Sequence, residues 1–263
     1  MTTSLSVITI CFNNLEELIS TCASVDKQTI PPQEHLIIDG SSGTTINQWL
    51  KTTPQPSWRK WVFERDNGIS DAFNKGINNC IGNLIHLLNS GDCFHDNDAI
   101  KTVINCFEKD ASIMWIHSCY IQHRGQLDVI SGVPFDKNQL WKGMRAVAHP
   151  TMFIKKEVYI RHGLYDTSLK ITMDYDLLVR IRDEKFLFIN KPLIRFAPGG
   201  ASHSQFFLGL KEVKQCHKKY LGYSFRQTLW QLRQKMLNYF MQTLIGKKWF
   251  QLKNRNNKVL NTE

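Results

Sequence analysis

The fold of this chain is decided by residues 66–92, DNGISDAFNKGINNCIGNLIHLLNSGD. Ile69, Phe73 and Ile77 recur every four residues, which is the pattern of a helix with one buried face. The apolar run 84–88, LIHLL, then has the length of a strand that is covered on both faces. A strand directly after a helix is part of the repeating unit of α/β proteins.

One carboxylate, Asp92, follows the predicted strand in the tight turn NSGD. In open α/β sheets ligands bind beyond the carboxyl ends of the strands, so Asp92 is a candidate site residue. The alternative interpretation is an acidic turn residue beside glycine, which is a common arrangement without a function of its own.

Strand and helix patterns alternate along the rest of the chain. The alternation continues to Glu108 and predicts an α/β fold with a mostly parallel central sheet flanked by helices. After it, the pattern predicts an antiparallel strand pair with its turn at 124–125. The other expected strands are 4–10, 35–38, 61–64 and 152–154, and the other expected helices are 15–25, 46–51, 156–162 and a helix opened by 172–176.

Residues 66–76 match the pattern D-x-G-I-x-D-A-x-N-K-G, and residues 88–92 read LNSGD. In this order, the two segments resemble the nucleotide-sugar-binding half of family 2 glycosyltransferases, which have the GT-A fold. The resemblance is to bacterial enzymes that build surface polysaccharides, of the colanic acid or O-antigen type. The matching residues of the first segment are Asp66, Gly68, Ile69, Asp71, Ala72, Asn74, Lys75 and Gly76.

Residues 149–180 resemble the acceptor side of the same family, so the resemblance covers roughly residues 4–200. Gly91 stands where relatives have a second Asp, and Met173 where many have Glu. An Asp is also missing from the loop 41–44. The matching residues are His149, Pro150, Phe153, Gly163, Tyr165, Asp166, Leu169, Asp174, Tyr175, Asp176, Leu177 and Arg180.

The resemblance implies a GT-A catalytic domain at 1–208 that transfers a sugar from a nucleotide-diphosphate donor with inversion. Within it, 1–110 would be the nucleotide-sugar-binding half and 111–208 the acceptor half. Residues 209–263 would form a basic, amphipathic helical tail.

The donor-binding residues implied by the resemblance are Asn13, Asp39, Asp66, Asp71 and Asn74. Asp39 lies where the family has an acid that binds the nucleotide base, although an Asx-turn that only shapes the loop is the alternative. Asp66 and Asp71 would contact ribose or donor sugar, or would only cap the helix that starts near Ile69.

Mg²⁺ or Mn²⁺ bridging the two phosphates would neutralise the leaving group, and Asp92 is the expected protein ligand. His203, in the glycine-containing segment 198–203, is a candidate further ligand. Asp174 is the expected general base that deprotonates the acceptor hydroxyl. Asp176 would support it or complement the helix dipole, and His149 would line the acceptor pocket or be a satisfied loop histidine.

The charge of the chain is concentrated at one end. Residues 209–263 contain twelve Lys or Arg and two Glu, a net charge of +10 that equals the net charge of the whole chain. Apolar residues with helical spacing between these cations predict contact of 209–258 with an anionic membrane surface. A helix packed on the catalytic domain is the alternative; no nucleic-acid recognition motif is seen.

We therefore expect a cytoplasmic enzyme on the inner face of the cell membrane, with a polyprenyl-linked glycan as acceptor. No run of about 18 apolar residues and no signal-type segment occurs in the sequence, and the seven scattered cysteines suggest a reducing compartment. Two other functions stay open. A sugar-phosphate nucleotidyltransferase would need a glycine-rich loop at 11–14, and a non-catalytic nucleotide-sugar-binding module would not need both Asp92 and Asp174.

Overall fold

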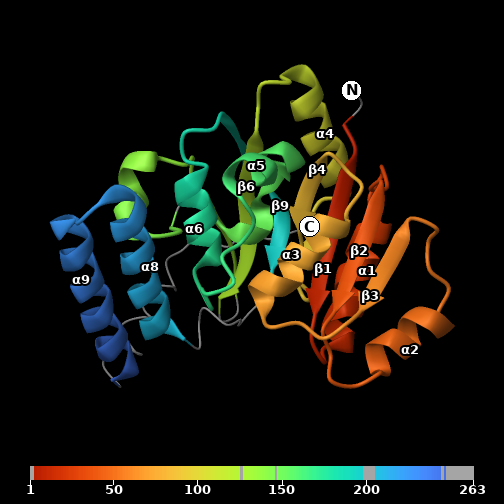
Figure 1. Cartoon of the computed structure of the whole chain (residues 1–263), viewed down its shortest axis with the longest axis horizontal. Coiled ribbons are helices and arrows are strands. Elements are labelled where there is room, and N and C mark those ends of the chain that lie inside the picture. Colours follow the sequence, from red (N-terminus) through yellow and green to blue (C-terminus); the bar gives the residue numbers. More distant parts are fainter. Residues whose placement is uncertain (1–2, 125–126, 146, 198–204, 244–245, 247–263) are drawn as a thin grey trace.

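The computed structural model describes residues 3–124, 127–145, 147–197, 205–243 and 246 (Figure 1). Within these residues one nine-stranded sheet runs in the order β3-β2-β1-β4-β8-β6-β9-β5, and β7 pairs with β6. The strands are β1 Leu5–Cys11, β2 Glu34–Asp39, β3 Arg59–Phe63, β4 Leu84–Leu87, β5 Cys93–Phe94, β6 Trp115–Arg124, β7 Leu127–Ser131, β8 Phe153–Lys155 and β9 Phe186–Phe196.

The helices lie between the strands in sequence as the alternating pattern predicts. The α-helices are α1 Leu15–Asp26, α2 Thr45–Thr52, α3 Ile69–Asn79, α4 Ala99–Lys109, α5 Lys156–His162, α6 Met173–Arg180, α8 Phe206–Leu221 and α9 Phe225–Gln242. Two short 3₁₀ helices, η1 Lys137–Lys142 and η2 His149–Thr151, precede β8.

The sheet has a parallel half and a mixed half. β3, β2, β1 and β4 are parallel neighbours, whereas β8 is antiparallel to both β4 and β6. β7 is antiparallel to β6, as the hairpin pattern predicts, and β9 is parallel to β6. The predicted α/β class is therefore confirmed, with the antiparallel pairs confined to the second half.

Side chains that alternate along β1 pack into different clusters because successive strand residues point to opposite faces. Ile8 packs with Phe73 and Ile77 of α3, while Leu5 and Val7 pack with residues of α4. Helices therefore cover both faces of the parallel half. This explains why residues 84–88 are apolar at nearly every position.

The carboxyl ends of β1, β2 and β4 meet at one edge. Cys11 is level with Asp39, and the amide of Ser90 donates to the carbonyl of Ile10 at 3.2 Å. The turn that carries Asp92 therefore continues beside the end of β1, as expected for a ligand site of an open α/β sheet.

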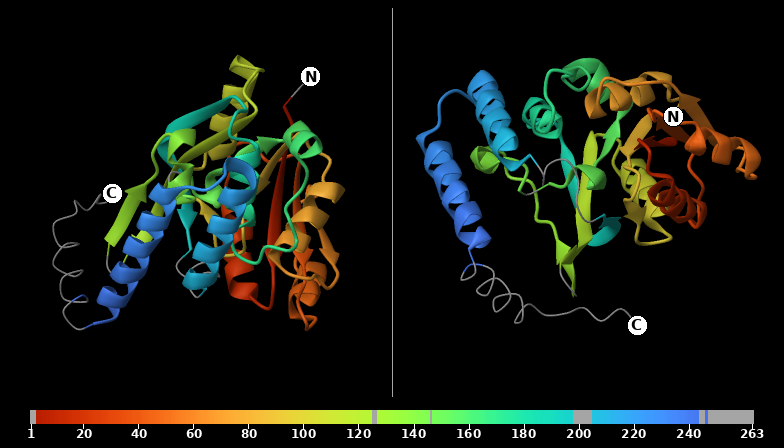
Figure 2. Two further views of the ribbon diagram at one scale, coloured as in Figure 1. Left: turned by 60° about the vertical axis from the view of Figure 1, so that its left-hand side comes forward. Right: turned by 90° about the horizontal axis from the view of Figure 1, so that it is seen from below.

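Helices α8 and α9 lie at the side of the molecule remote from β3, with α9 outside α8 (Figures 1 and 2). α8 packs against α6 and buries Glu212, Cys216 and His217. The boundary expected between residues 208 and 209 falls inside α8. Among the described residues, no helix is both long and apolar enough to cross a membrane.

Candidate active site

A cavity of about 1230 Å³ opens at the edge where β1 and β4 end. This exceeds the range of about 300–1,000 Å³ typical of small-molecule pockets, so it has room for more than one ligand. Its wall comes from residues before and after position 110 and also from Phe206 of α8 and Asn238 of α9.

Asp174 lies in the first turn of α6 and lines this cavity. One carboxylate oxygen accepts a hydrogen bond from the amide of Tyr175 at 2.7 Å. Burial raises the pKa of Asp174 to about 6, and the charge of Glu212 acts in the same direction. A carboxylate with this pKa is ionised at neutral pH and accepts a proton more readily than an ordinary aspartate does.

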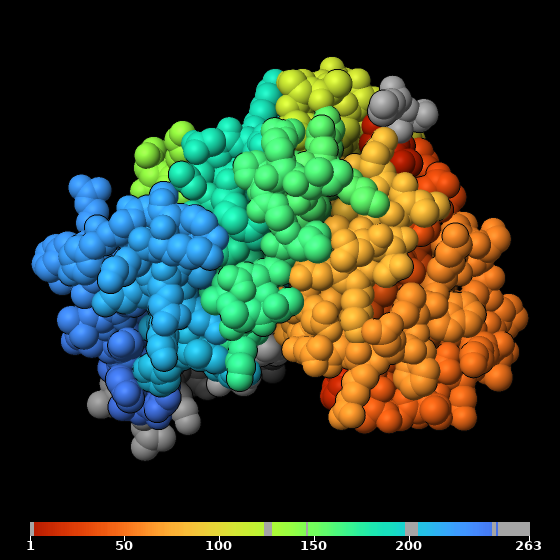
Figure 3. Space-filling model, viewed as in Figure 1, coloured from red at the N-terminus to blue at the C-terminus, as the bar shows by residue number. Residues whose placement is uncertain are grey.

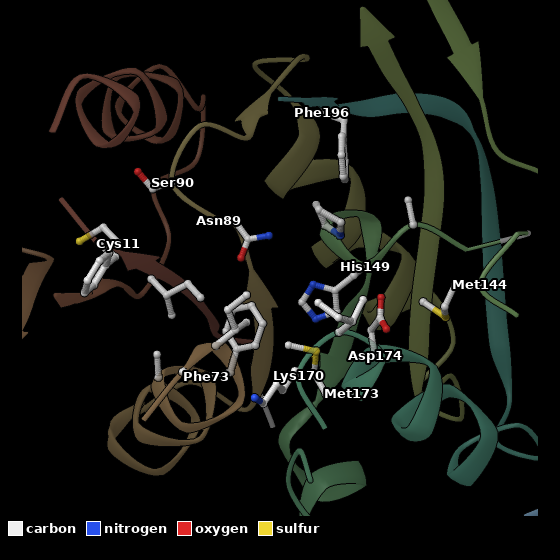
Figure 4. A pocket seen from close by; sticks show the side chains of 18 of the residues that line it. Cys11, Phe73, Asn89, Ser90, Met144, His149, Lys170, Met173, Asp174 and Phe196 are labelled. Carbon is white, nitrogen blue, oxygen red and sulfur yellow. The ribbon is translucent and has the colours of Figure 1, made fainter. Parts of the chain in front are cut away.

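His149 lines the same cavity as Asp174 (Figure 4). Its Nε2 is 3.0 Å from the hydroxyl of Tyr165, and its ring packs 5.1 Å from the ring of Phe73. Burial lowers the pKa of His149 to about 4, so the imidazole is neutral at physiological pH. A neutral ring on the same cavity wall adds no positive charge that would lower the proton affinity of Asp174.

Glu212 of α8 holds the segment that leads into Asp174. One of its oxygens accepts from the amide of Lys170 at 3.0 Å. The other accepts from the amides of Ile171 and Thr172 at 2.9 and 3.0 Å and from the Thr172 hydroxyl at 3.3 Å. These donors directly precede α6, so Glu212 holds the backbone from which the first turn of that helix begins.

Asp176 is placed differently from Asp174, although both lie in the first turn of α6. It is fully buried, and one oxygen accepts from the Arg180 Nε at 2.9 Å. The Arg180 guanidinium also donates to the carbonyls of His162, Gly163 and Leu164. Asp176 is absent from the cavity wall. Through Arg180 it connects α6 to the end of α5.

The turn after β4 presents oxygen atoms near the cavity. Asn89 and Ser90 line it, and the Asn89 Oδ1 and Ser90 Oγ are buried without a partner among the described residues. Asp92 lies just behind this wall and is 3% exposed. Its oxygens accept from the amide of Ala197 at 2.8 Å and from the Asn89 side chain at 3.3 Å.

Burial raises the pKa of Asp92 to about 7, which means that its negative charge is poorly compensated by its two donors. A divalent cation would supply the missing charge, and carboxylate and amide oxygens are the ligands that Mg²⁺ and Mn²⁺ prefer. Among the described residues, no three His, Cys, Asp or Glu side chains gather into a metal site. Asp92 and Asn89 thus fit a cation whose remaining ligands are phosphate oxygens and water. His203 lies outside the described residues.

Asp39 lies fully buried at the end of β2. Its Oδ1 accepts from the amide of Ser41 at 3.0 Å, while its Oδ2 has no partner among the described residues. The Asp66 carboxylate lies directly against Gly40, where an added Cβ would approach it to 1.7 Å, and Asp66 lines the cavity. Asp39, at the end of β2, and Asp66, in the loop after β3, are therefore close to each other beside the end of β1, and of the two only Asp66 lines the cavity.

Three expected donor residues are engaged away from the cavity wall. Asn13, with φ 54°, ties the loop after β1 to the hydroxyls of Ser41 and Ser42. Asp71 accepts from the amide of Asn67 at 2.9 Å, which satisfies the start of α3. The Asn74 side chain exchanges two hydrogen bonds, of 2.9 and 3.0 Å, with the backbone of Tyr165 and so joins the two halves of the domain.

The cavity wall also contains residues outside the predicted site. Arg65 and Lys170 are exposed cations on the cavity wall, and Tyr120 and Phe196 come from β6 and β9. Lys170 lies four residues before Asp174 within the family-like segment, so its position in the sequence could have indicated that it lies near the site. Glu212 carries no such signal because it belongs to the basic tail.

The chain belongs to glycosyl transferase family 2, whose model matches residues 6–159, more than half of its length. An uncharacterized glycosyltransferase of Mycobacterium tuberculosis is 30% identical over 179 residues, which cover 67% of this chain and 68% of the relative. An uncharacterized glycosyltransferase of Haemophilus influenzae is 25% identical over 201 residues, covering 72% of this chain and 66% of the relative.

Solved structures share the fold. The mannosyltransferase PcManGT from Pyrobaculum calidifontis, in complex with GDP-Man and Mn²⁺, superposes with a TM-score of 0.62 at 16% identity over 85% of this chain and 66% of its own. TarS of Staphylococcus aureus superposes with a TM-score of 0.60 at 12% identity, and 92% of this chain spans 44% of TarS. The predicted GT-A fold and the glycosyltransferase class are thereby confirmed.

Proposed function

We propose that this glycosyltransferase inverts the anomeric centre of a nucleotide-diphospho-sugar, with Asp174 as general base. The Asp174 carboxylate takes the proton of the acceptor hydroxyl, and the hydroxyl oxygen forms the new bond to the anomeric carbon. The bond from that carbon to the diphosphate breaks on the opposite face, and the nucleoside diphosphate leaves with the electron pair. One observation carries this proposal: Asp174, with its pKa raised to about 6, faces a cavity shared by both halves of the domain.

The donor would lie along the ends of β1, β2 and β4. The unpartnered Oδ2 of Asp39 suits an N–H group of the nucleotide base, and Asp66 suits a ribose hydroxyl. Asp92, with Asn89, would hold Mg²⁺ or Mn²⁺, which supplies charge neutralisation for the leaving diphosphate. Arg65 and Lys170 lie on the same wall and would add positive charge.

The acceptor would be a saccharide carried on a polyprenyl lipid, in the synthesis of a bacterial surface polysaccharide. The basic segment 209–258 would hold the enzyme on the cytoplasmic face of the membrane. The concentration of the net charge of +10 in residues 209–263 supports this part of the proposal.

Thermal unfolding of the full chain with UDP, GDP or dTDP, each with and without Mn²⁺, tests the donor site. Ligands that bind the native state raise the unfolding temperature. We expect one nucleotide to do so in a Mn²⁺-dependent manner in the wild type and in Asp174→Asn, and not in Asp92→Ala. Donor turnover should then be lost in Asp174→Asn. A nucleotide response without turnover in the wild type would favour the binding module, and no response would refute the donor site.

A further inference from the structure

Helix α9 turns its apolar side chains outward. Its exposed apolar residues recur at spacings of three and four and so form one stripe. Phe225 is 65% exposed and Met236 64%. By contrast, Gln227 and Gln231 are buried against the rest of the molecule. We call these exposed residues the α9 stripe: Phe225, Leu229, Leu232, Met236, Tyr239 and Phe240.

Cations flank the α9 stripe on both sides. At 3.6 residues per turn, Arg226 and Arg233 lie along one edge and Lys235 along the other, and all three are exposed. α9 contains no Asp or Glu. Paired stripes of two copies of this chain would therefore bring cations together without a counter-charge, whereas anionic lipid headgroups would supply that charge along both edges.

The α9 stripe also reaches the candidate active site. Phe206 and Asn238 line the cavity, the ring of Phe207 is 5.3 Å from that of Phe206, and Phe207 lies 5.8 Å from the ring of Tyr239. Aromatic side chains thus run without interruption from the cavity wall to the stripe. In Figure 3, α8 and α9 form one edge of the molecule, beside the second half of the domain.

We infer that α9 lies in the interface of an anionic bilayer with the α9 stripe inserted, and that the acceptor enters the cavity past Phe207 and Tyr239 from that bilayer. The docking deepens the membrane attachment proposed above for 209–258 and is independent of catalysis, whereas the entry route rests on the proposed transfer to a lipid-linked acceptor. Interfacial helices of this kind insert an apolar face between flanking cations.

Vesicle co-sedimentation of the full chain tests the docking. Phosphatidylcholine vesicles with phosphatidylglycerol should bind the wild type, and vesicles of phosphatidylcholine alone should bind it much less. Leu232→Glu should lower the binding roughly tenfold or more, because burying a leucine in lipid is replaced by burying a charge. Ile160→Glu is the matched control, since Ile160 is 78% exposed on α5, and it should bind as the wild type does.

Equal binding of Leu232→Glu and the wild type would overturn the inference. So would a wild-type dimer in sedimentation that dissociates in Leu232→Glu without any vesicle binding, because the stripe would then face a second copy. The nucleotide-dependent rise in unfolding temperature should persist in Leu232→Glu. If nucleotide did not raise the unfolding temperature of the wild type, the donor site would be refuted, while the result on vesicle binding would stand.

Discussion

Replacing Glu212 with glutamine should weaken both the fold and catalysis. The Glu212 carboxylate accepts hydrogen bonds from the amides of Lys170, Ile171 and Thr172 and from the Thr172 hydroxyl. Glutamine keeps one acceptor oxygen but replaces the other with an NH₂ group. This NH₂ group would face at least one backbone N–H, so two donors would meet without an acceptor. Leaving a buried donor unpaired and losing charge-assisted bonds should cost about 2–4 kcal/mol of unfolding free energy.

The catalytic effect follows from the position of these donors, because they precede the turn that carries Asp174. A misplacement of about 1 Å near reacting atoms costs on the order of a hundredfold in rate. We expect kcat of Glu212→Gln to fall roughly tenfold to a hundredfold by the same reasoning. Nucleotide affinity should fall less than kcat, because most of the expected nucleotide site lies at the ends of β1, β2 and β4 and only Lys170 is bound by Glu212.

Urea unfolding, steady-state transfer kinetics and the pH profile measure these effects. Removing the Glu212 charge should also move the acid limb of the profile to lower pH, because that charge helps to raise the pKa of Asp174. Glu108→Gln is the control, since Glu108 is exposed on α4. A destabilised Glu212→Gln with unchanged kcat and pH profile would limit Glu212 to packing, and unchanged stability would refute the hydrogen-bond reasoning.

Three further predictions concern Asp174, Asp92 and Arg180. The pKa of Asp174 is raised to about 6, so kcat/KM should rise with pH through about 6. Ionising the same buried carboxylate lowers the stability of the fold as pH rises from about 4 to 6. Asp174→Asn should therefore raise the unfolding temperature at pH 8, and it should lower transfer about 10²- to 10⁴-fold. A pH-independent rate from pH 5 to 8 would contradict this. Mn²⁺ affinity, by calorimetry with nucleotide present, should increase as pH rises through about 7, because the proton on Asp92 competes with the ion, and Asp92→Ala should remove this binding at every pH. Arg180→Met leaves Asp176 buried and unpaired and should cost about 3–5 kcal/mol in urea unfolding, whereas Arg161→Met, on the exposed side of α5, should cost little.

Most of the parallel half was predictable because its signals are local. The spacing of apolar residues and the turn residues predict the ends of β1 to β4, and of the helices between them, to within one or two residues. β9 was not predicted. Its segment FLFINKPLIRF contains Pro192, which has no N–H for a ladder, and β9 pairs with β6 through register shifts at Cys119. Only the pairing with β6 shows that β9 continues as one strand on both sides of Pro192.

The site was predictable in part. Asp174 and Asp92 belong to segments with family-like spacing, and the structure places Asp174 on the cavity wall and Asp92 just behind it. The same segments contain Asp71 and Asn74, whose hydrogen bonds serve the start of α3 and the contact with Tyr165. Their roles toward a donor stay predictions. Residue spacing does not separate a ligand contact from a structural contact, because both need the same polar side chain.

The sequence by itself determined the α/β class, the carboxylates at strand and helix ends, and an amphipathic, basic α9. Only the tertiary structure decided which face of α9 is covered. Gln227 and Gln231 face inward, and the Gln231 side chain donates a hydrogen bond to the carbonyl of Leu210 that joins α9 to α8. The position of Glu212 behind Asp174 was likewise decided by packing, because the two residues are far apart in sequence and meet only where α8 lies on α6.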